Sequence, residues 1–70
     1  MKRWYEKFKR GDEVEVLSIE TGDWEPAIVV GTFQEGDRLN PTSRGYRVAI
    51  DVPGHKNPNY HVQLGYIEPA

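Results

Sequence analysis

The sequence predicts a small all-β domain, a five-stranded barrel preceded by a short N-terminal arm or helical turn. Three segments alternate apolar and polar residues with the period of two that is typical of half-buried strands. Clusters of turn-forming residues, mainly Gly, Pro, Asn and Asp, separate the segments at short intervals. No segment has the apolar spacing and length of an ordinary helix. We therefore divide the chain into an arm, residues 1–10, and a barrel, residues 11–70.

Length and composition exclude several classes of protein. A chain of 70 residues buries only about 60% of its unfolded surface, so a deep enzyme cleft within one subunit is not expected. The absence of cysteine removes disulfides and thiolate metal sites and fits a reducing compartment. No apolar run approaches the roughly 20 residues that span a bilayer, and no apolar signal core follows the start. We expect a cytoplasmic protein that makes no membrane contact.

The formal net charge of −2 is unevenly distributed along the chain. Residues 1–10 have a balance of +4, whereas residues 11–35 hold seven acids and no base. Residues 36–70 have a balance of +1. The sequence thus places a basic arm in front of an acidic first hairpin, and an acidic surface favours a cationic partner.

The first strand is predicted at residues 13–16, where Val14 and Val16 face the core and the two glutamates face water. The apolar phase shifts by one residue after Val16, which indicates a bulge or the end of pairing near Leu17. A turn follows at residues 20–23, where Gly22 is free to adopt a positive φ.

The second strand is predicted at residues 24–33. Pro26 has no N–H to donate, so it should lie near the strand start or against an edge. Residues 27–30 are apolar on both faces, which suits a strand buried by curvature on one side and by a neighbour or a partner on the other. Gly31 allows a bend. Residues 35–44 form the longest polar segment and are interpreted as a mobile loop and a binding edge.

The remaining strands follow the same pattern. Residues 45–52 form the third strand, with Tyr46, Val48 and Ile50 on the inner face. Residues 53–59 are dense in turn formers and are predicted to be a loop. Residues 60–64 form the fourth strand, and residues 66–68 form a short last strand after a tight single-turn break at Gly65.

The arm allows two interpretations. Residues 2–9 can form about two turns of helix with Trp4, Tyr5 and Phe8 along one side. These aromatic side chains would then cover an open end of the barrel. Alternatively, the basic arm binds nucleic acid or an acidic protein surface.

Four short motifs give the chain a resemblance to SH3-like barrels of the Tudor and plant Agenet group. The motifs are GDEVEV at residues 11–16, WEPAIV at 24–29, GYRV at 45–48 and YIEP at 66–69. The resemblance implies a ligand site formed by an aromatic cage for methylated lysine or arginine, aided by an acid. The matching candidates are the rings of Trp24 and Tyr46 with Tyr60 or Tyr66, and Asp23 or Glu25 as the acid.

A weaker set of motifs is similar to the plasmid-borne type II dihydrofolate reductases. These are GDEV at residues 11–14, Trp24 with residues 28–29, GYRV at 45–48 and VQL at 62–64. The resemblance implies a tetramer with one central pore for NADPH and dihydrofolate, lined here by Gln63 and Leu64. The chain departs from the family at Gly65, where the family has tyrosine, and at Val16, where it has a substrate-binding lysine. Seven acids near the pore would also oppose anionic ligands, so we expect no cofactor.

No pattern of catalytic residues is present. His55 and His61 are six residues apart without a firm third ligand, which does not predict a metal site. The sequence contains no phosphate-binding glycine loop, nucleophile elbow or HExxH motif. The paired Glu13 and Glu15 are interpreted as a solvated strand face.

We therefore expect a non-catalytic interaction module that binds a basic peptide or protein segment, with or without methylation. The first alternative is nucleic-acid binding, for which the candidate residues are Lys2, Arg3, Lys7, Lys9, Arg10, Arg38 and Arg44. A sequence pI of about 5.6 argues against that alternative. The second alternative is the tetrameric reductase. The sequence leaves the oligomeric state open.

Overall fold

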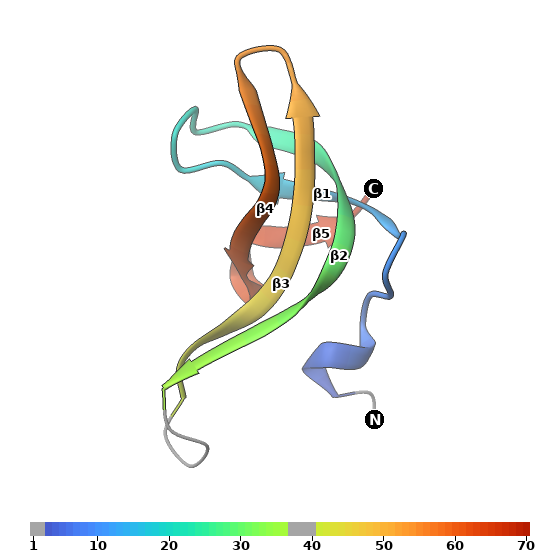
Figure 1. Cartoon of the computed structure of the whole chain (residues 1–70), viewed down its shortest axis with the longest axis vertical. Coiled ribbons are helices and arrows are strands. Elements are labelled where there is room, and N and C mark those ends of the chain that lie inside the picture. The colour runs from blue at the N-terminus through green and yellow to red at the C-terminus, as the bar shows by residue number, and fades with distance from the viewer. Residues whose placement is uncertain (1–2, 37–40) are drawn as a thin grey trace.

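The computed structural model describes residues 3–36 and 41–70 (Figure 1). Its elements are the 3-10 turn η1 (Trp4–Glu6), the strands β1 (Glu13–Leu17), β2 (Trp24–Gly36), β3 (Pro41–Val52) and β4 (His55–Gln63), the 3-10 turn η2 (Leu64–Tyr66) and the strand β5 (Ile67–Pro69). The strands form a single antiparallel sheet in the order β4-β3-β2-β1-β5. The predicted five-stranded all-β domain is therefore confirmed. In the part of the chain that is described, no helix is long and apolar enough to cross a membrane.

The sheet curls strongly, so that β1 and β5 cross behind β3 and β4 in Figure 1. The two edge strands are β4 and β5. No ladder joins these edges within residues 3–36 and 41–70, so the closure expected of a barrel is not confirmed. The curl still encloses a core, because each strand presents alternate side chains to the same side.

The predicted alternation of β1 and β3 is confirmed. Val14 and Val16 of β1 are fully buried, as are Tyr46 and Val48 of β3. Val62 and Ile67 bring β4 and β5 into the same apolar cluster. Burying a valine side chain contributes roughly 1.5–3 kcal/mol, so this small cluster carries most of the stability of the chain.

The strand β2 is longer than predicted and continues to Gly36. Its register with β3 shifts between Val29 and Gly31, which marks a bulge at the predicted bend. Pro26 lies near the strand start, as expected. Within the single chain, the curvature of the sheet buries Ala27 and Val29, whereas the Ile28 side chain on the other face is 40% exposed.

Two segments predicted as loops are mostly strand. The polar segment 35–44 continues β2 to Gly36 and starts β3 at Pro41, and residues 37–40 lie outside the described residues. The segment 53–59 turns only at residues 53–54, and β4 begins at His55. A register shift between Val48 and Ile50 leaves Pro58 without a partner on β3, so the missing N–H is accommodated at a bulge.

The turns at Gly22 and Gly65 were predicted correctly. The residue Gly22 adopts a φ of 77° in the β1–β2 loop, where any other residue would be strained. Gly65 lies in η2, the single turn between β4 and β5. The last strand begins one residue later than predicted, at Ile67.

The arm forms a single 3-10 turn and not two turns of α-helix. Phe8 is buried in the core cluster, and the Trp4 ring makes an edge contact with Tyr46 at 6.2 Å between centroids. The Tyr46 hydroxyl accepts a hydrogen bond from the Phe8 N–H at 3.1 Å and donates one to the Trp4 carbonyl. This arrangement supports the interpretation that the arm covers one end of the sheet.

Candidate functional site

An apolar stripe lies on the outer face of β2. The strand alternates strictly at its start, with Glu25, Ala27 and Val29 buried and the residues between them exposed. The exposed residues are Trp24, Pro26 and Ile28, of which Trp24 is 41% exposed. Successive outward residues of a strand are roughly 7 Å apart, so the stripe is about 13 Å long. We call these three residues the outer stripe.

A hollow lies along part of the outer stripe. It has a volume of about 390 Å³, and its exposed lining residues are Glu13, Pro26, Ile28, Asp51 and Ala70. Ala49, which is paired with Ile28, completes the floor between β2 and β3. We call this hollow the outer groove. The small side chain of Ala49 beside Ile28 leaves room for the side chain of a partner.

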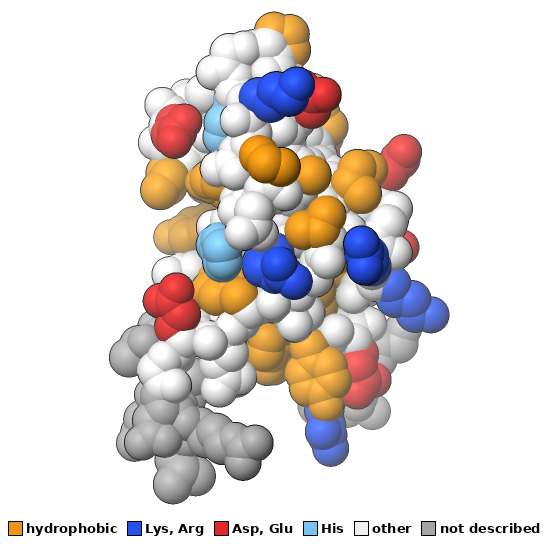
Figure 2. Space-filling model, in the orientation of Figure 1, with side chains coloured by type: hydrophobic (Ala, Val, Ile, Leu, Met, Phe, Trp, Pro, Cys, Tyr) orange, Lys and Arg blue, Asp and Glu red, His pale blue; other side chains and the backbone are white. Residues whose placement is uncertain are grey.

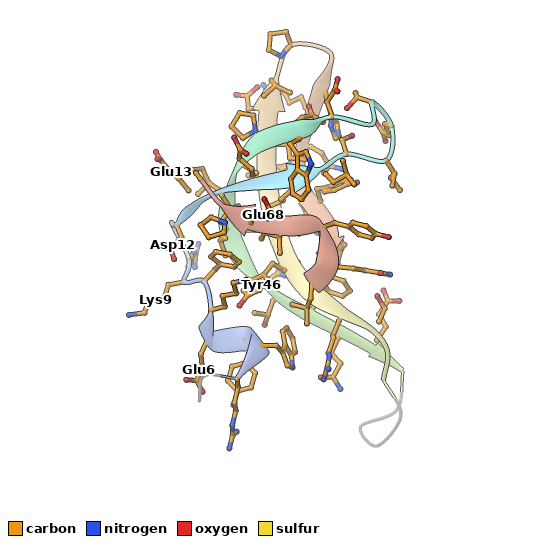
Figure 3. The ribbon with its side chains drawn as sticks, turned by 180° about the vertical axis from the view of Figure 1, so that it is seen from behind. Glu6, Lys9, Asp12, Glu13, Tyr46 and Glu68 are labelled. Atoms are coloured by element: carbon orange, nitrogen blue, oxygen red, sulfur yellow. The ribbon has the colours of Figure 1, made fainter. Side chains whose placement is uncertain are left out.

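Carboxylates border the outer groove on the side of β1 and β5. Glu13 is paired with Ile28, and Glu15 is paired with Pro26 on one side and with Glu68 on the other. All three glutamates are exposed, and Figure 3 shows Glu13 and Glu68 on these adjacent strands. We call Glu13, Glu15 and Glu68 the acidic rim. Asp51 adds a fourth carboxylate but is paired with Lys56 on β4.

The acidic rim forms no ion pair within the described part of the chain. The close contacts found there between basic and carboxylate groups all involve His55, and none reaches Glu13, Glu15 or Glu68. Like charges directly opposite one another in a sheet are destabilising, as Glu15 and Glu68 are here. A cation bound between them would relieve that repulsion.

Tyr46 does not belong to this site. It is completely buried on the inner face of β3, where its hydroxyl holds the arm. Figure 3 shows its side chain directed toward the arm and away from Glu13 and Glu68. Tyr46 therefore offers no ring face to a ligand, because the sheet lies between it and the outer stripe.

Glu25 is also directed inward. It is 7% exposed, and its Oε1 accepts a hydrogen bond from Nδ1–H of His55 at 2.9 Å. The Thr21 hydroxyl donates to the same oxygen at 3.3 Å. The hydrogen bond from His55 is the main reason that the pKa of Glu25 lies below its ordinary value, and it outweighs the opposing effect of burial. Glu25 therefore joins β2 to β4 and does not face a ligand on the outer stripe.

Ser18, His55 and Glu25 have the composition of a catalytic triad but not its geometry. Ser18 Oγ and Glu25 Oε1 both approach the same imidazole nitrogen, Nδ1, at 3.4 Å and 2.9 Å. The other nitrogen, Nε2, is buried, makes no hydrogen bond within the described residues, and lies 3.7 Å from Glu20 Oε2. A triad needs the serine on the nitrogen opposite the carboxylate. Ser18 is also completely buried, so this cluster is structural.

Tyr60 and Tyr66 line a second hollow of about 310 Å³ with Leu17, Ile19, His61, Val62 and Gln63. Tyr60 packs on the core and makes an edge contact with His55 at 5.5 Å between ring centroids. Tyr66 is 45% exposed in η2. Neither Trp24 nor Tyr46 lines this hollow, so it does not bring the four predicted rings together.

The remaining predicted residues are dispersed. Asp23 is exposed in the β1–β2 loop next to Trp24, where its carbonyl accepts a hydrogen bond from the Ser18 N–H at 3.0 Å. Gln63 and Leu64, which the reductase resemblance places in a pore, lie at the junction of β4 and η2. The Gln63 amide donates a hydrogen bond to Ser43 Oγ at 3.4 Å. None of these residues contributes to the outer groove.

The basic candidates lie mainly on the arm. Arg3, Lys7, Lys9 and Arg10 are exposed, whereas Lys2 and Arg38 lie outside the described residues. The Arg44 guanidinium lies 5.8 Å from the centre of the Trp4 ring. Figure 2 shows one face of the molecule, on which basic, acidic and apolar side chains are interspersed. On this face, the described residues form no continuous basic surface of the kind that follows a nucleic-acid backbone.

The sequence analysis missed the acidic rim and the outer groove. The sequence did indicate such a face in two ways. Residues 24–30 are mostly apolar at both even and odd positions, and the neighbouring strand has glutamates at alternate positions. Within residues 3–36 and 41–70, no three carboxylate or imidazole groups converge to hold a metal ion. The outer face can therefore offer apolar contact and negative charge to a ligand. Comparisons with protein-family models, with curated proteins and with solved structures found no match to this chain.

Proposed function

We propose that this chain is a non-catalytic interaction module that binds a cationic protein segment on its outer face. Its sheet order and the single turn before β5 are in keeping with an SH3-like barrel, to which we assign it as part of this proposal. In the bound state, the outer stripe contacts the aliphatic stems of lysine or arginine side chains. Their charged heads then lie against the acidic rim.

The observation that carries the proposal is the juxtaposition of exposed apolar residues and unpaired carboxylates on the same face. An isolated exposed isoleucine is common and needs no explanation. Here Ile28 lies on the same face of β2 as Trp24 and Pro26, and the neighbouring strands β1 and β5 carry exposed glutamates. Uncompensated negative charge beside an apolar stripe suits a ligand that combines positive charge with aliphatic surface.

The proposal favours unmodified lysine or arginine over methylated residues. Trp24 is the one aromatic member of the outer stripe, and a cage for a methylated ammonium group needs several rings around the cation. A single ring suits the planar guanidinium of arginine, which stacks on aromatic faces. The recognition expected here is by charge and aliphatic contact.

The experiment is an amide chemical-shift titration with a short peptide of alternating arginine and valine. The control peptide has glutamine in place of each arginine, and an oligonucleotide and NADPH are titrated in parallel. Shifts at residues 13–15, 24–28 and 68 with the basic peptide alone would support the proposal. Shifts confined to the arm with the oligonucleotide, or at residues 63–64 with NADPH, would overturn it in favour of one of the alternatives.

Matched variants locate the site. Ile28→Ser is expected to weaken peptide binding by about tenfold, because it removes apolar contact from the groove without adding charge. Thr32→Ser is the control, because Thr32 is also exposed on β2 but lies beyond the paired region of β1. Equal affinities for the two variants would exclude the outer groove as the binding site.

A further inference from the structure

We propose that the outer groove binds the basic arm, residues 3–10, of a second copy of this chain. This inference rests on the proposed function, because it names the cationic segment that the groove receives. The arm is the one strongly basic segment of the sequence, with a balance of +4 over residues 1–10. The segment that follows it, residues 11–35, holds seven acids and no base. The chain therefore carries both members of a charge-complementary pair.

The arm matches the outer face in more than charge. Tyr5 is 40% exposed and lies between two cationic residues in the sequence, Arg3 and Lys7. Contacts between proteins commonly combine an apolar or aromatic centre with a polar rim. Tyr5 provides the aromatic centre for the outer stripe, and the arm cations provide partners for the acidic rim.

The part of the arm that carries Tyr5 is held away from the outer groove of its own chain. Phe8 is buried in the core, and its N–H donates to the hydroxyl of Tyr46 on the inner face of β3. The Gly11 N–H then donates to the Val29 carbonyl at 2.8 Å, which fixes the entry into β1. The outer groove lies on the opposite face of the same sheet. The contact must therefore form between two molecules.

The arm is already ordered in the single chain. The turn η1 and the contacts of Trp4 and Phe8 with Tyr46 hold its backbone, so little conformational entropy is lost on docking. Its cations form no ion pair with a carboxylate in the described part of the chain. Charges displayed on an ordered segment favour fast association that weakens as salt is added.

The arm of one copy in the groove of another is a contact between two different surfaces. Such a contact closes into a symmetric pair if each arm enters the groove of the other copy, and otherwise propagates from copy to copy. Both outcomes give self-association that depends on protein concentration. Both depend on the same charges.

A charge-swap experiment tests the inference. The rim variant carries Glu15→Lys and Glu68→Lys, and the arm variant carries Lys7→Glu and Lys9→Glu. All four side chains are exposed, so both variants are expected to fold, which their amide spectra check. Sedimentation velocity is run on each variant, on their equal mixture and on the wild type, at low salt and in about 0.5 M salt.

The wild type is expected to associate at low salt and to dissociate at high salt. Each variant alone is expected to associate about tenfold more weakly, because the rim variant has cations on both its arm and its rim and the arm variant has no net charge left on residues 1–10. The mixture is expected to associate again, since the basic arm of the rim variant complements the acidic rim of the arm variant. Association of the variants alone as strongly as the wild type, or no association in the mixture, would overturn the inference.

One further result separates this inference from the proposed function. If the wild type stays monomeric while the arginine–valine peptide still shifts the amides of the outer groove, the self-association is wrong and the proposed function stands. If the wild type is monomeric and no basic peptide shifts these amides, both are wrong. The variant Tyr5→Ala adds a charge-neutral test, because it is expected to weaken self-association severalfold without changing peptide binding.

Discussion

Trp24 and Glu25 are neighbours in β2 with opposite environments, because one side chain points outward and the other inward. Trp24 leaves 41% of its surface exposed on the outer stripe, whereas Glu25 leaves 7%. A carboxylate in that position costs free energy unless it is hydrogen-bonded. His55, from the start of β4, provides the hydrogen bond at 2.9 Å. Glu25 therefore stabilises the contact between the β1–β2 hairpin and β4.

This network predicts how stability changes in acid. The pKa of Glu25 is lowered in the folded chain, mainly by the hydrogen bond from His55, from an ordinary value of 4.5. A carboxyl group with a lowered folded pKa contributes stability above its unfolded pKa and loses that contribution as pH falls through the folded pKa. The urea concentration at the midpoint of unfolding is therefore expected to decrease as the pH is lowered below 4.5. The variant Glu25→Gln should show a flatter dependence, and an unchanged slope would contradict the role given to Glu25.

Loss of the Tyr46 hydroxyl is expected to weaken the attachment of the arm to the sheet. Tyr46→Phe leaves the ring in the core but removes the acceptor of the Phe8 N–H and the donor to the Trp4 carbonyl. The expected cost is about 1–3 kcal/mol in the free energy of unfolding, because a buried N–H loses its partner. Amide exchange of residues 4–10 should also accelerate. Unchanged exchange in the arm would show that the aromatic contacts alone hold it.

Among the elements, β1 and β3 could be predicted because alternation of valine with charged residues has few other interpretations. The start of β4 could not, because residues 53–59 contain two prolines, a glycine and two asparagines, all of which favour turns. The structure accommodates Pro58 at a bulge in an edge strand, where the missing N–H breaks no ladder. The resemblance places Glu25 in the ligand site as an acid beside Trp24, and its inward orientation could not be predicted because its partner, His55, is 30 residues away in the sequence.

The pairing of β3 with β4 predicts unequal effects at two glycines. A Cβ at Gly45 would lie 2.0 Å from the carbonyl oxygen of Val62, so the two strands would have to move apart. Gly45→Ala is expected to destabilise the chain by about 2–3 kcal/mol, measured by urea unfolding. A Cβ at Gly65 meets no atom within 4 Å, and Gly65→Ala should cost less than about 0.5 kcal/mol. Similar costs at both positions would contradict the close approach at Gly45.

For the whole molecule, the charge distribution links stability to binding. The opposition of Glu15 and Glu68 weakens the free chain and strengthens its attraction for a cation. Glu68→Lys is expected to raise the free energy of unfolding by about 0.5 kcal/mol and to weaken binding of the basic peptide. Urea unfolding and peptide titration on the same sample measure the two effects. A loss of stability with unchanged affinity would contradict the role of the rim.

A cationic ligand and a role for Trp24 were expected from the sequence, whereas the rest of the proposed site could be identified only in the structure. The acidic character of the first hairpin is a property of composition and could be read directly. The pairing of Glu15 with Glu68 could not, because it depends on the register between strands that are 50 residues apart. The positions of the rings in the expected cage also depend on the pairing of distant strands, so they could not be predicted from the sequence either.

The strict alternation at the start of β2 has a consequence for protein engineering. In β1, β2 and β5, alternate residues form the core, and the residues between them form the proposed binding face. Side chains on the outer face can therefore be varied in a combinatorial library without removing a core contact. The positions to randomise are Glu13, Glu15, Trp24, Pro26, Ile28, Ala49 and Glu68. Selection from such a library would yield binders of new specificity on an unchanged 70-residue scaffold.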